Sequence, residues 1–221
     1  MHLVDLSHVI EHGTVTYPGL PTPEIGEHLS YEVSRERYED AEFTIGRITM
    51  VSNTGTYLDT PAHRFRDGSD LSGLSLTRCA DLPAVVVDAD GSIGPDVLDG
   101  LAVTGVAVLL RTGWDRHWGT EKYGDTSHPH LTADAATLLA DNGASLIGID
   151  SINLDGTATG HRPAHTILLR AGISVVEHLT NLSALPSTGA RFTAVPPLIR
   201  GLATFPVRAF ATLPDTARQR V

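Results

Sequence analysis

The polar segment over residues 52–63 holds the densest group of side chains that could take part in chemistry. It follows a strand-like run over residues 43–51, and we expect it to be a loop that leaves a buried strand. Asp59 and His63 lie on either side of Pro61, which fixes a backbone dihedral, while Gly55 allows close approach of the chain. The two side chains can therefore converge on one point. Ordinary turn chemistry is the alternative, because the same residue types hydrogen-bond locally in loops.

A second group of candidate residues begins at His161. His161 and His165 can face one way on a helix only if Pro163 occupies the first turn, and His161 then lies just outside the helix. Glu177 ends an apolar run, a position at which a strand delivers a side chain to the rim of a sheet. A capping or solvated role is the alternative for a histidine at the start of a helix.

Two further acidic residues follow the apolar run over residues 145–149. Asp150, with Ser151, ends that run, and Asp155 comes shortly after it. Sheets present polar groups to a site at such positions. Turn formation and capping of the next element explain these residues equally well.

The elements that would position these groups can be predicted from hydrophobic patterning. A short strand is expected over residues 2–7, and further strands are expected over residues 43–51, 84–88, 106–111, 145–149, 173–176 and 205–212. Helices are expected over residues 133–141, capped by Thr132, and over residues 162–170, which end before Gly172. Most strands are continuous apolar runs, as in a sheet covered on both faces. The pattern predicts an α/β fold with a mixed sheet and helices packed outside it.

Composition limits the partners and the compartment. The 221-residue chain has 16 Lys and Arg against 26 Asp and Glu, a formal charge of −10, which argues against nucleic acid and anionic membranes and favours a small-molecule partner. The single cysteine, Cys79, cannot form an internal disulfide. We find no secretory signal and no apolar run near the roughly 20 residues that span a bilayer. These features predict a cytoplasmic protein with one domain over residues 1–221.

Taken together and in order, several short motifs resemble the cyclase family of metal-dependent hydrolases, which includes the bacterial kynurenine formamidases and isatin hydrolase. The similarity runs from about residue 3 to residue 212. The motifs are Asp5-Leu-Ser-His8, Tyr17-Pro-Gly19, the segment from Asn53 to His63, Leu110-Arg-Thr-Gly-Trp114, Gly148-Ile-Asp150-Ser, His165-Thr-Ile-Leu-Leu and Glu177-His-Leu-Thr-Asn-Leu182. The resemblance implies a swivelling β/β/α fold and a homodimer or homotetramer. It also implies one or two divalent ions that assist cleavage of an amide-like bond.

The resemblance also assigns roles, and the chain departs from the pattern at two of them. The family loop reads His-x-Gly-Thr-His-x-Asp-x-Pro-x-His, with the first two histidines and the aspartate as metal ligands and the last histidine in proton transfer. Asn53 and Tyr57 stand at the two histidine positions here. The downstream ligands of the family match His165 and Glu177.

The two replacements remove the imidazoles that best suit zinc. Asp59, His165 and Glu177 remain, an oxygen-rich set that could hold one Mn or Zn ion with water in the remaining positions. Loss of metal binding is the alternative.

The implied mechanism uses a metal-activated water, with His63 as the acid or base. Tyr57 could donate a hydrogen bond to a developing oxyanion, and Asn53 could offer its amide to the substrate. Tyr17 and Trp114 could form aromatic walls of the pocket, which would suit an aromatic or cyclic substrate, although packing in the core explains both rings as well.

Two functions from different classes follow from these residues. The first is a hydrolase of an amide, formamide, lactam or lactone, favoured by the four retained groups Asp59, His63, His165 and Glu177. The second is a small-molecule binding protein, or a metal-independent isomerase or dehydratase, on the same scaffold. Asn53 and Tyr57 favour this second function.

Overall fold

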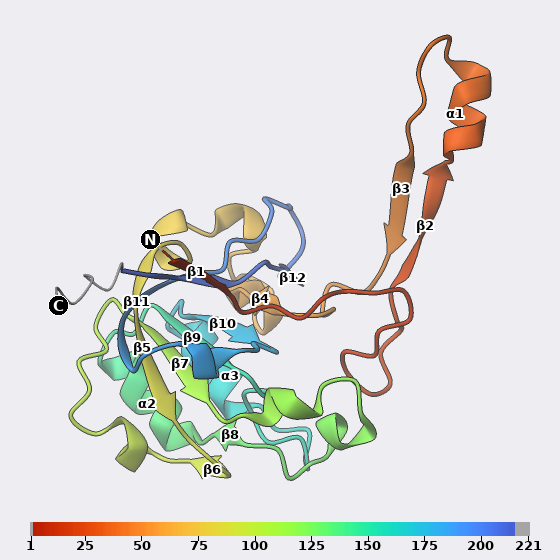
Figure 1. Cartoon of the computed structure of the whole chain (residues 1–221). Helices are drawn as coiled ribbons and strands as arrows, with labels where there is room; N and C mark the ends of the chain where they lie inside the picture. The colour runs from red at the N-terminus through yellow and green to blue at the C-terminus, as the bar shows by residue number, and fades with distance from the viewer. Residues whose placement is uncertain (1, 215–221) are drawn as a thin grey trace, which may run out of the picture.

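A sheet of nine strands forms the centre of the protein in the computed structural model, which describes residues 2–214 (Figure 1). The strand order is β1-β13-β11-β5-β7-β9-β10-β4-β12, and β5, β7, β9 and β10 run parallel while the other pairings are antiparallel. These strands span His2–Asp5 (β1), Tyr57–Asp59 (β4), Leu82–Asp88 (β5), Ala107–Arg111 (β7), Leu146–Ile149 (β9), Ser174–Glu177 (β10), Thr188–Thr193 (β11), Thr204–Pro206 (β12) and Phe210–Leu213 (β13). The mixed sheet with helices outside it confirms the predicted α/β class.

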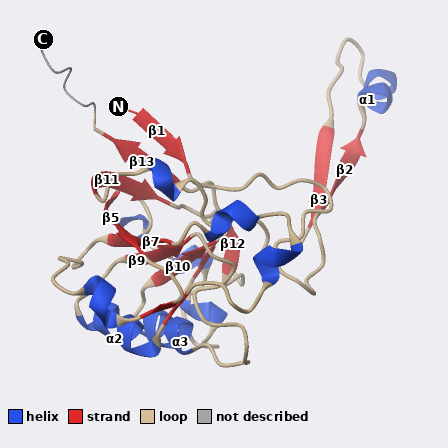
Figure 2. Ribbon diagram, turned by 60° about the horizontal axis from the view of Figure 1, so that its bottom comes forward, coloured by secondary structure: helices blue, strands red, loops and turns tan. Residues whose placement is uncertain are grey.

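Helices α2 (Ala133–Asp141) and α3 (Pro163–Arg170) cover one face of the parallel strands (Figure 2). The hydroxyl of Thr132 caps α2 by accepting from the backbone of Ala135 at 3.2 Å. Pro163 occupies the first turn of α3, where its missing N–H costs nothing. The apolar runs of β7, β9 and β10 are buried because helices cover this face and a second apolar cluster covers the other. Both predicted helices are confirmed.

The predicted strand over residues 205–212 is wrong, because the chain divides there into β12 and β13. Pro206 is the last residue of β12, at the edge of the sheet, where its missing N–H removes no bond to β4. β12 pairs with β4 at one end of the strand order, whereas β13 pairs with β1 and β11 at the other. An extended chain covers about 14 Å over the four steps from Pro206 to Phe210. The two ends of the sheet must therefore lie close together, and the sheet curls.

The strand expected over residues 43–51 is real but exposed, which corrects its prediction as a buried strand. β3 (Ile45–Thr49) pairs only with β2 (Glu24–Leu29), and together with α1 (Tyr31–Arg37) the two strands form an arm that stands away from the body (Figure 1). All five residues of β3 are exposed. Its apolar content predicted burial, but no second layer formed by residues 2–214 covers it. The elements β2 and α1 were not predicted.

The polar segment over residues 52–63 is only partly a loop. Residues Tyr57–Asp59 form β4, a buried strand between β10 and β12, and Pro61–His63 form a short 3-10 helix. Sequence patterning missed β4 because the strand has only three residues and lies in a polar segment. Its hydrogen-bonding partners, β10 and β12, lie far away in the chain.

The remaining short strands, β6 (Ser92–Ile93) and β8 (His130–Leu131), form a small parallel pair. Within residues 2–214, we find no helix with both the length and the apolar character needed to cross a bilayer.

Gly68 sets the conformation of the loop that carries His63. A Cβ atom at Gly68 would lie 2.5 Å from the carbonyl carbon of Pro61, a backbone atom that cannot move aside cheaply. We therefore expect Gly68→Ala to lower the free energy of unfolding by about 1–3 kcal/mol, as other overpacking substitutions do. Gly73→Ala is the matched control, because its Cβ would meet only Ser69 at 3.5 Å. Urea unfolding of the two variants measures the difference, and equal stability would contradict the close approach.

Candidate active site

The pairing of β4 with its two neighbours places the candidate residues on one face of the sheet. Tyr57 lies opposite Glu177 of β10, and Asp59 lies opposite Thr204 of β12. Tyr57 and Asp59 are two residues apart in a strand, so their side chains point to the same face. All of these side chains are buried.

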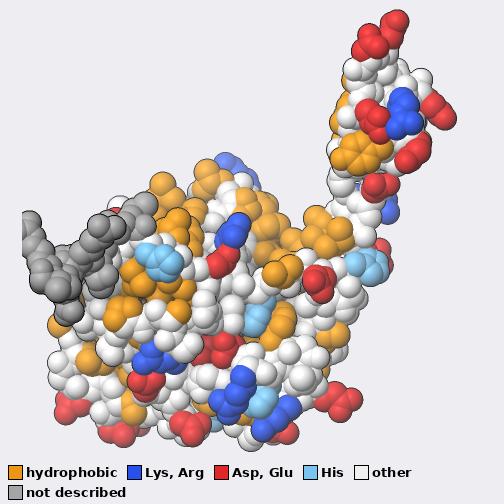
Figure 3. Space-filling model, viewed as in Figure 1, with side chains coloured by type: hydrophobic (Ala, Val, Ile, Leu, Met, Phe, Trp, Pro, Cys, Tyr) orange, Lys and Arg blue, Asp and Glu red, His pale blue; other side chains and the backbone are white. Residues whose placement is uncertain are grey.

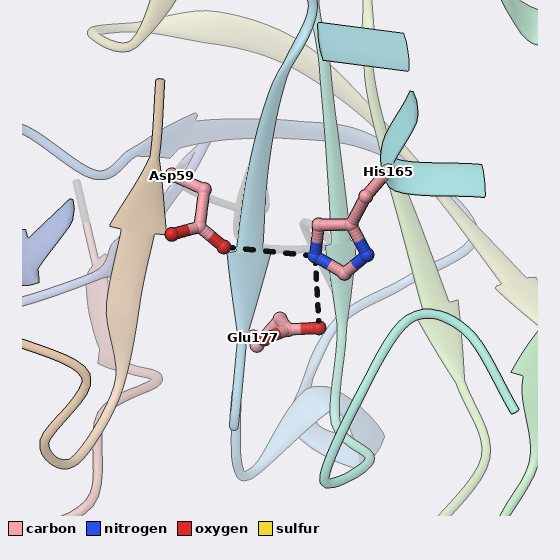
Figure 4. A group of neighbouring side chains, drawn as sticks. All are labelled: Asp59, His165 and Glu177. Atoms are coloured by element: carbon pink, nitrogen blue, oxygen red, sulfur yellow. Dashed lines mark ion pairs between the residues drawn. The ribbon is translucent and has the colours of Figure 1, made fainter. Parts of the chain in front are cut away.

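Asp59, His165 and Glu177 converge on one point although they come from three separate elements (Figure 4). The Nε2 atom of His165 lies 3.6 Å from Oδ2 of Asp59 and 3.3 Å from Oε1 of Glu177. One candidate ligand atom from each residue lies within 4.8 Å of the others. The sequence predicted this group, and the fold brings its members together.

Asp155 fixes the position of His165 in the first turn of α3. Its carboxylate accepts from the backbone N–H groups of Ala164 and His165, at 2.7 and 3.0 Å. It also lies 2.6 Å from Nδ1 of His165. A carboxylate at that distance holds the proton on Nδ1 and turns Nε2 toward Asp59 and Glu177, the arrangement common behind histidine ligands. Asp155 therefore both caps α3 and positions its histidine.

The cluster fits a divalent cation. Oδ2 of Asp59 is buried and has no hydrogen-bond partner within residues 2–214, an expensive arrangement for a carboxylate oxygen. Burial by itself lowers the pKa of His165, but Glu177, Asp155 and Asp59 outweigh it and raise that pKa well above its usual value. The group thus attracts positive charge to the point between the two carboxylates. One nitrogen and two carboxylate oxygens form a donor set that suits Mn or Zn.

A network of hydrogen bonds orients the carboxylate of Glu177. The hydroxyl of Tyr57 donates to Oε2 of Glu177 at 2.7 Å, and the backbone N–H of Leu154 donates to Oε1 at 2.6 Å. His178 lies 3.2 Å from the same Tyr57 hydroxyl and 2.9 Å from the hydroxyl of Tyr123. Burial lowers the pKa of His178 to about 4, so it is neutral at pH 7. It can therefore donate to one tyrosine and accept from the other.

The prediction that Tyr57 donates to an oxyanion does not fit this arrangement, because the hydroxyl proton is already directed at Glu177. Burial, with Glu177 and Asp59 nearby, raises the pKa of Tyr57 well above its usual value. The phenol therefore stays protonated and is a poor metal ligand. Its contact with Glu177 makes Tyr57 a positioning residue for the cluster.

His63 lies at the edge of the cluster, with about a third of its side chain exposed (34%). Its Nδ1 is 3.1 Å from Oγ1 of Thr204 and 3.4 Å from Oδ1 of Asp59. Thr204 also donates a short hydrogen bond to Oδ1 of Asp59. Because the single hydroxyl proton of Thr204 goes to the carboxylate, Thr204 can only accept from His63. Neutral His63 then carries its proton on Nδ1 and its lone pair on Nε2.

A pocket of about 250 Å³ opens above the cluster. His63, His165 and Glu177 line it together with the predicted substrate residues Tyr17 and Asn53 and with Arg64, Arg162 and Asn153. Trp114, the other predicted wall, is not among the lining residues. Its indole is 7% exposed, donates to the carbonyl of Tyr123 at 3.0 Å and packs with Tyr123 and Ile152. For Trp114, core packing is the correct explanation.

Several residues of the site were not predicted to belong to it. Thr204 is the first residue of β12, just before the predicted strand over residues 205–212, and no local sequence pattern marks it as a site residue. Arg64 directly follows His63, and Arg162 precedes the proline of α3, so proximity to predicted residues was the only available signal. The carboxylate of Asp150, by contrast, accepts hydrogen bonds from Thr112 and Gly113 and stabilises the turn that follows β7.

Comparison with known proteins agrees with this geometry. The family model described as "Putative cyclase" matches residues 4–156. The chain belongs to the cyclase family. It is 32% identical to a kynurenine formamidase of Bacillus cereus over 93% of this chain and 95% of that protein. It is also 32% identical to a kynurenine formamidase of Bacillus mycoides, over 80% of this chain and 81% of that protein.

Solved structures of cyclase-like proteins share the fold. Isatin hydrolase A from Labrenzia aggregata aligns with a TM-score of 0.83 at 23% identity, covering 96% of this chain and 93% of the other. An isatin hydrolase bound to the product analogue thioisatinate aligns with a TM-score of 0.79 at 25% identity, covering 96% and 92%. A predicted metal-dependent hydrolase from Bacillus stearothermophilus aligns with a TM-score of 0.76 at 24% identity, covering 95% and 97%. These likenesses support the curled mixed sheet of the cyclase family.

Proposed function

We propose that this protein is a metal-dependent hydrolase that cleaves an amide-type C–N bond in a small molecule. The observation that carries the proposal is the buried cluster of Asp59, His165 and Glu177: Asp59 has an unpartnered carboxylate oxygen, and His165 and Glu177 line an open pocket. The kynurenine formamidases among its relatives favour a formamide, and the isatin hydrolases of similar fold favour a cyclic amide. Release of formate from N-formylkynurenine, or opening of isatin, tests the two substrate types.

Asp59, His165 and Glu177 would hold one divalent ion, Mn or Zn. When bound, such an ion lowers the pKa of a water molecule and polarises a substrate carbonyl. The protein's own contribution is orientation. Asp155 fixes His165, Tyr57 and Leu154 fix Glu177, and Thr204 fixes Asp59, so the three ligand residues are preorganised.

His63 would move the proton. With its Nδ1 proton directed to Thr204, the lone pair on Nε2 has no hydrogen-bond partner within residues 2–214 and is free to accept a proton from water. The resulting imidazolium lies beside the carboxylate of Asp59, which stabilises its charge. It can then return the proton to the leaving nitrogen. Thr204 keeps the imidazole in the tautomer that this cycle needs.

The first expected outcome concerns the metal. Protein purified without chelator should contain about one divalent ion per chain. Addition of Mn or Zn at a free concentration of about a hundred times its dissociation constant should raise the free energy of unfolding of the metal-free protein by about 2.7 kcal/mol. Asp59→Ala should abolish both effects because it removes the unpartnered oxygen. Elemental analysis and thermal melts measure them. Asp67→Ala, which removes an exposed carboxylate, is the matched control. Metal content unchanged in Asp59→Ala would refute the site.

A second expected outcome concerns His63. His63→Ala should lower kcat by about 10² to 10⁴, the usual contribution of general acid–base catalysis, with little change in melting temperature. Thr204→Val should lower kcat less, because the imidazole is still present but no longer held in one tautomer. His12→Ala removes an exposed histidine that does not line the pocket and serves as the control. Full activity in His63→Ala would remove it from the mechanism.

We also propose that the protein forms a homodimer or homotetramer, with the arm as its contact surface. The arm exposes six large apolar side chains, and apolar surface is visible on the face of the arm drawn in Figure 3. A two-stranded hairpin is marginally stable on its own in water. In a symmetric dimer, the arm of each copy would cover the apolar residues on the arm of the other. The exposed apolar residues are Ile25, Tyr31, Tyr38, Phe43, Ile45 and Ile48.

The oligomer can be tested by placing charge on the arm. The double variant Ile45→Glu with Ile48→Glu should reduce the mass measured by light scattering to that of one chain, because carboxylates are costly to bury in an apolar contact. Leu198→Glu, at a body residue that is 78% exposed, should leave the mass unchanged. A wild-type protein that is monomeric at every concentration would contradict the proposal.

A further inference from the structure

Two arginines stand where the pocket over the cluster meets a second, outer depression. The inner pocket of about 250 Å³ and the outer depression of about 470 Å³ share Arg64 and Arg162 among their lining residues. The inner pocket contains His165 and Glu177, whereas Pro163, at the start of α3, lines the outer one. A substrate that extends from the inner pocket into the outer depression would lie against these two guanidinium groups.

Neither Arg64 nor Arg162 has an acidic partner in the part of the chain that the structure describes. Within residues 2–214, no carboxylate forms an ion pair with Arg64 or Arg162, although Arg111 and Arg191 elsewhere pair with Asp88 and Asp81. This arrangement is notable in a chain with 26 acidic and 16 basic side chains. Two unpaired positive charges at the mouth of a pocket attract an anion.

Contacts within the protein restrict both groups while leaving donors free. Nη1 of Arg162 donates to the carbonyl oxygens of Gly156, Thr159 and His161, at 3.2, 2.7 and 2.8 Å. Nη2 of Arg64 donates to Oγ1 of Thr166 at 3.1 Å. The Nε and Nη2 groups of Arg162, and the Nε and Nη1 groups of Arg64, have no acceptor within residues 2–214. Restricted donors lose less entropy when they bind a ligand.

The surroundings favour a carboxylate over a phosphate. Phosphates are often bound by the free backbone N–H groups at a helix N-terminus. At α3 those groups, on Ala164 and His165, already bind Asp155. The donors that remain are planar guanidinium groups, which bind either anion, so the occupied backbone N–H groups of α3 are what favours a carboxylate.

We propose that Arg64 and Arg162 form a subsite for a carboxylate, so that the substrate is an amide or formamide bearing a carboxylate remote from the bond that is cleaved. This inference rests on the proposed amide hydrolysis and adds a requirement to it. The cluster acts on the amide, while the arginines bind the other end of the substrate and select it by charge.

The test compares two substrates that differ only in charge, N-formylkynurenine and its methyl ester. The wild-type kcat/KM should be about 10- to 100-fold higher for the acid, the usual value of charge-assisted hydrogen bonds. Arg64→Gln should reduce that preference at least several-fold, and Arg64→Gln with Arg162→Gln should nearly abolish it. Arg64→Lys should retain part of it, because the charge remains without the planar fork.

Arg66→Gln is the matched control, since Arg66 is exposed, lies two positions from Arg64 and is absent from the lining of both pockets. It should keep the wild-type preference. Arg162 also holds its own loop, so Arg162→Gln could disturb folding. Arg64 makes a single hydrogen bond to the protein, and Arg64→Gln is therefore the deciding variant. Wild-type enzyme that hydrolyses acid and ester equally well, or an unchanged preference in Arg64→Gln, would overturn the subsite.

A binding measurement separates this inference from the proposed function. If neither formamide is hydrolysed, the proposed function fails for formamides, and the subsite is judged by titration with benzoate and benzamide. Benzoate should bind the wild-type protein at least 10-fold more tightly than benzamide, and Arg64→Gln should remove most of that difference. Benzoate binding that persists in Arg64→Gln with Arg162→Gln would place the anion away from the two arginines and overturn the proposal.

Discussion

The register of β4 between β10 and β12 is the constraint on which the site depends. It sets Tyr57 opposite Glu177 and Asp59 opposite Thr204. A slip of one residue would turn Tyr57 and Asp59 to the other face of the sheet. The carboxylate of Asp59 would then face away from His165, and the three ligand atoms would no longer converge. Three residues of strand thus decide whether the protein has an active site.

Burial of two carboxylates beside one imidazole is the second constraint. Such a group is costly unless a positive charge or hydrogen bonds compensate it. The fold supplies hydrogen bonds to most of its oxygens, from Thr204, Tyr57 and Leu154. It leaves one oxygen of Asp59 without any. The unsatisfied oxygen and the crowding of negative charge both favour a cation, so the stability of the site and its chemistry have a common cause.

Much of the fold could be predicted because its signals are local. The apolar runs that became β5, β7, β9 and β10, the cap at Thr132 and the proline that begins α3 each act within a few residues. The strand over residues 43–51 shows the limit of this reasoning. Its apolar residues predict burial, but burial depends on which other layer covers a strand, and composition does not specify the covering layer.

The sequence by itself determined the residue types and order that identify the cyclase family, and it indicated Asp59, His165 and Glu177 as a ligand set. Only the tertiary structure decided that Tyr57 donates to Glu177, that Thr204 bridges Asp59 and His63, and that Trp114 packs in the core. These contacts join residues up to 145 positions apart. Their geometry is set by strand register and by the curl of the sheet, which arise from packing of the whole chain and leave no local pattern.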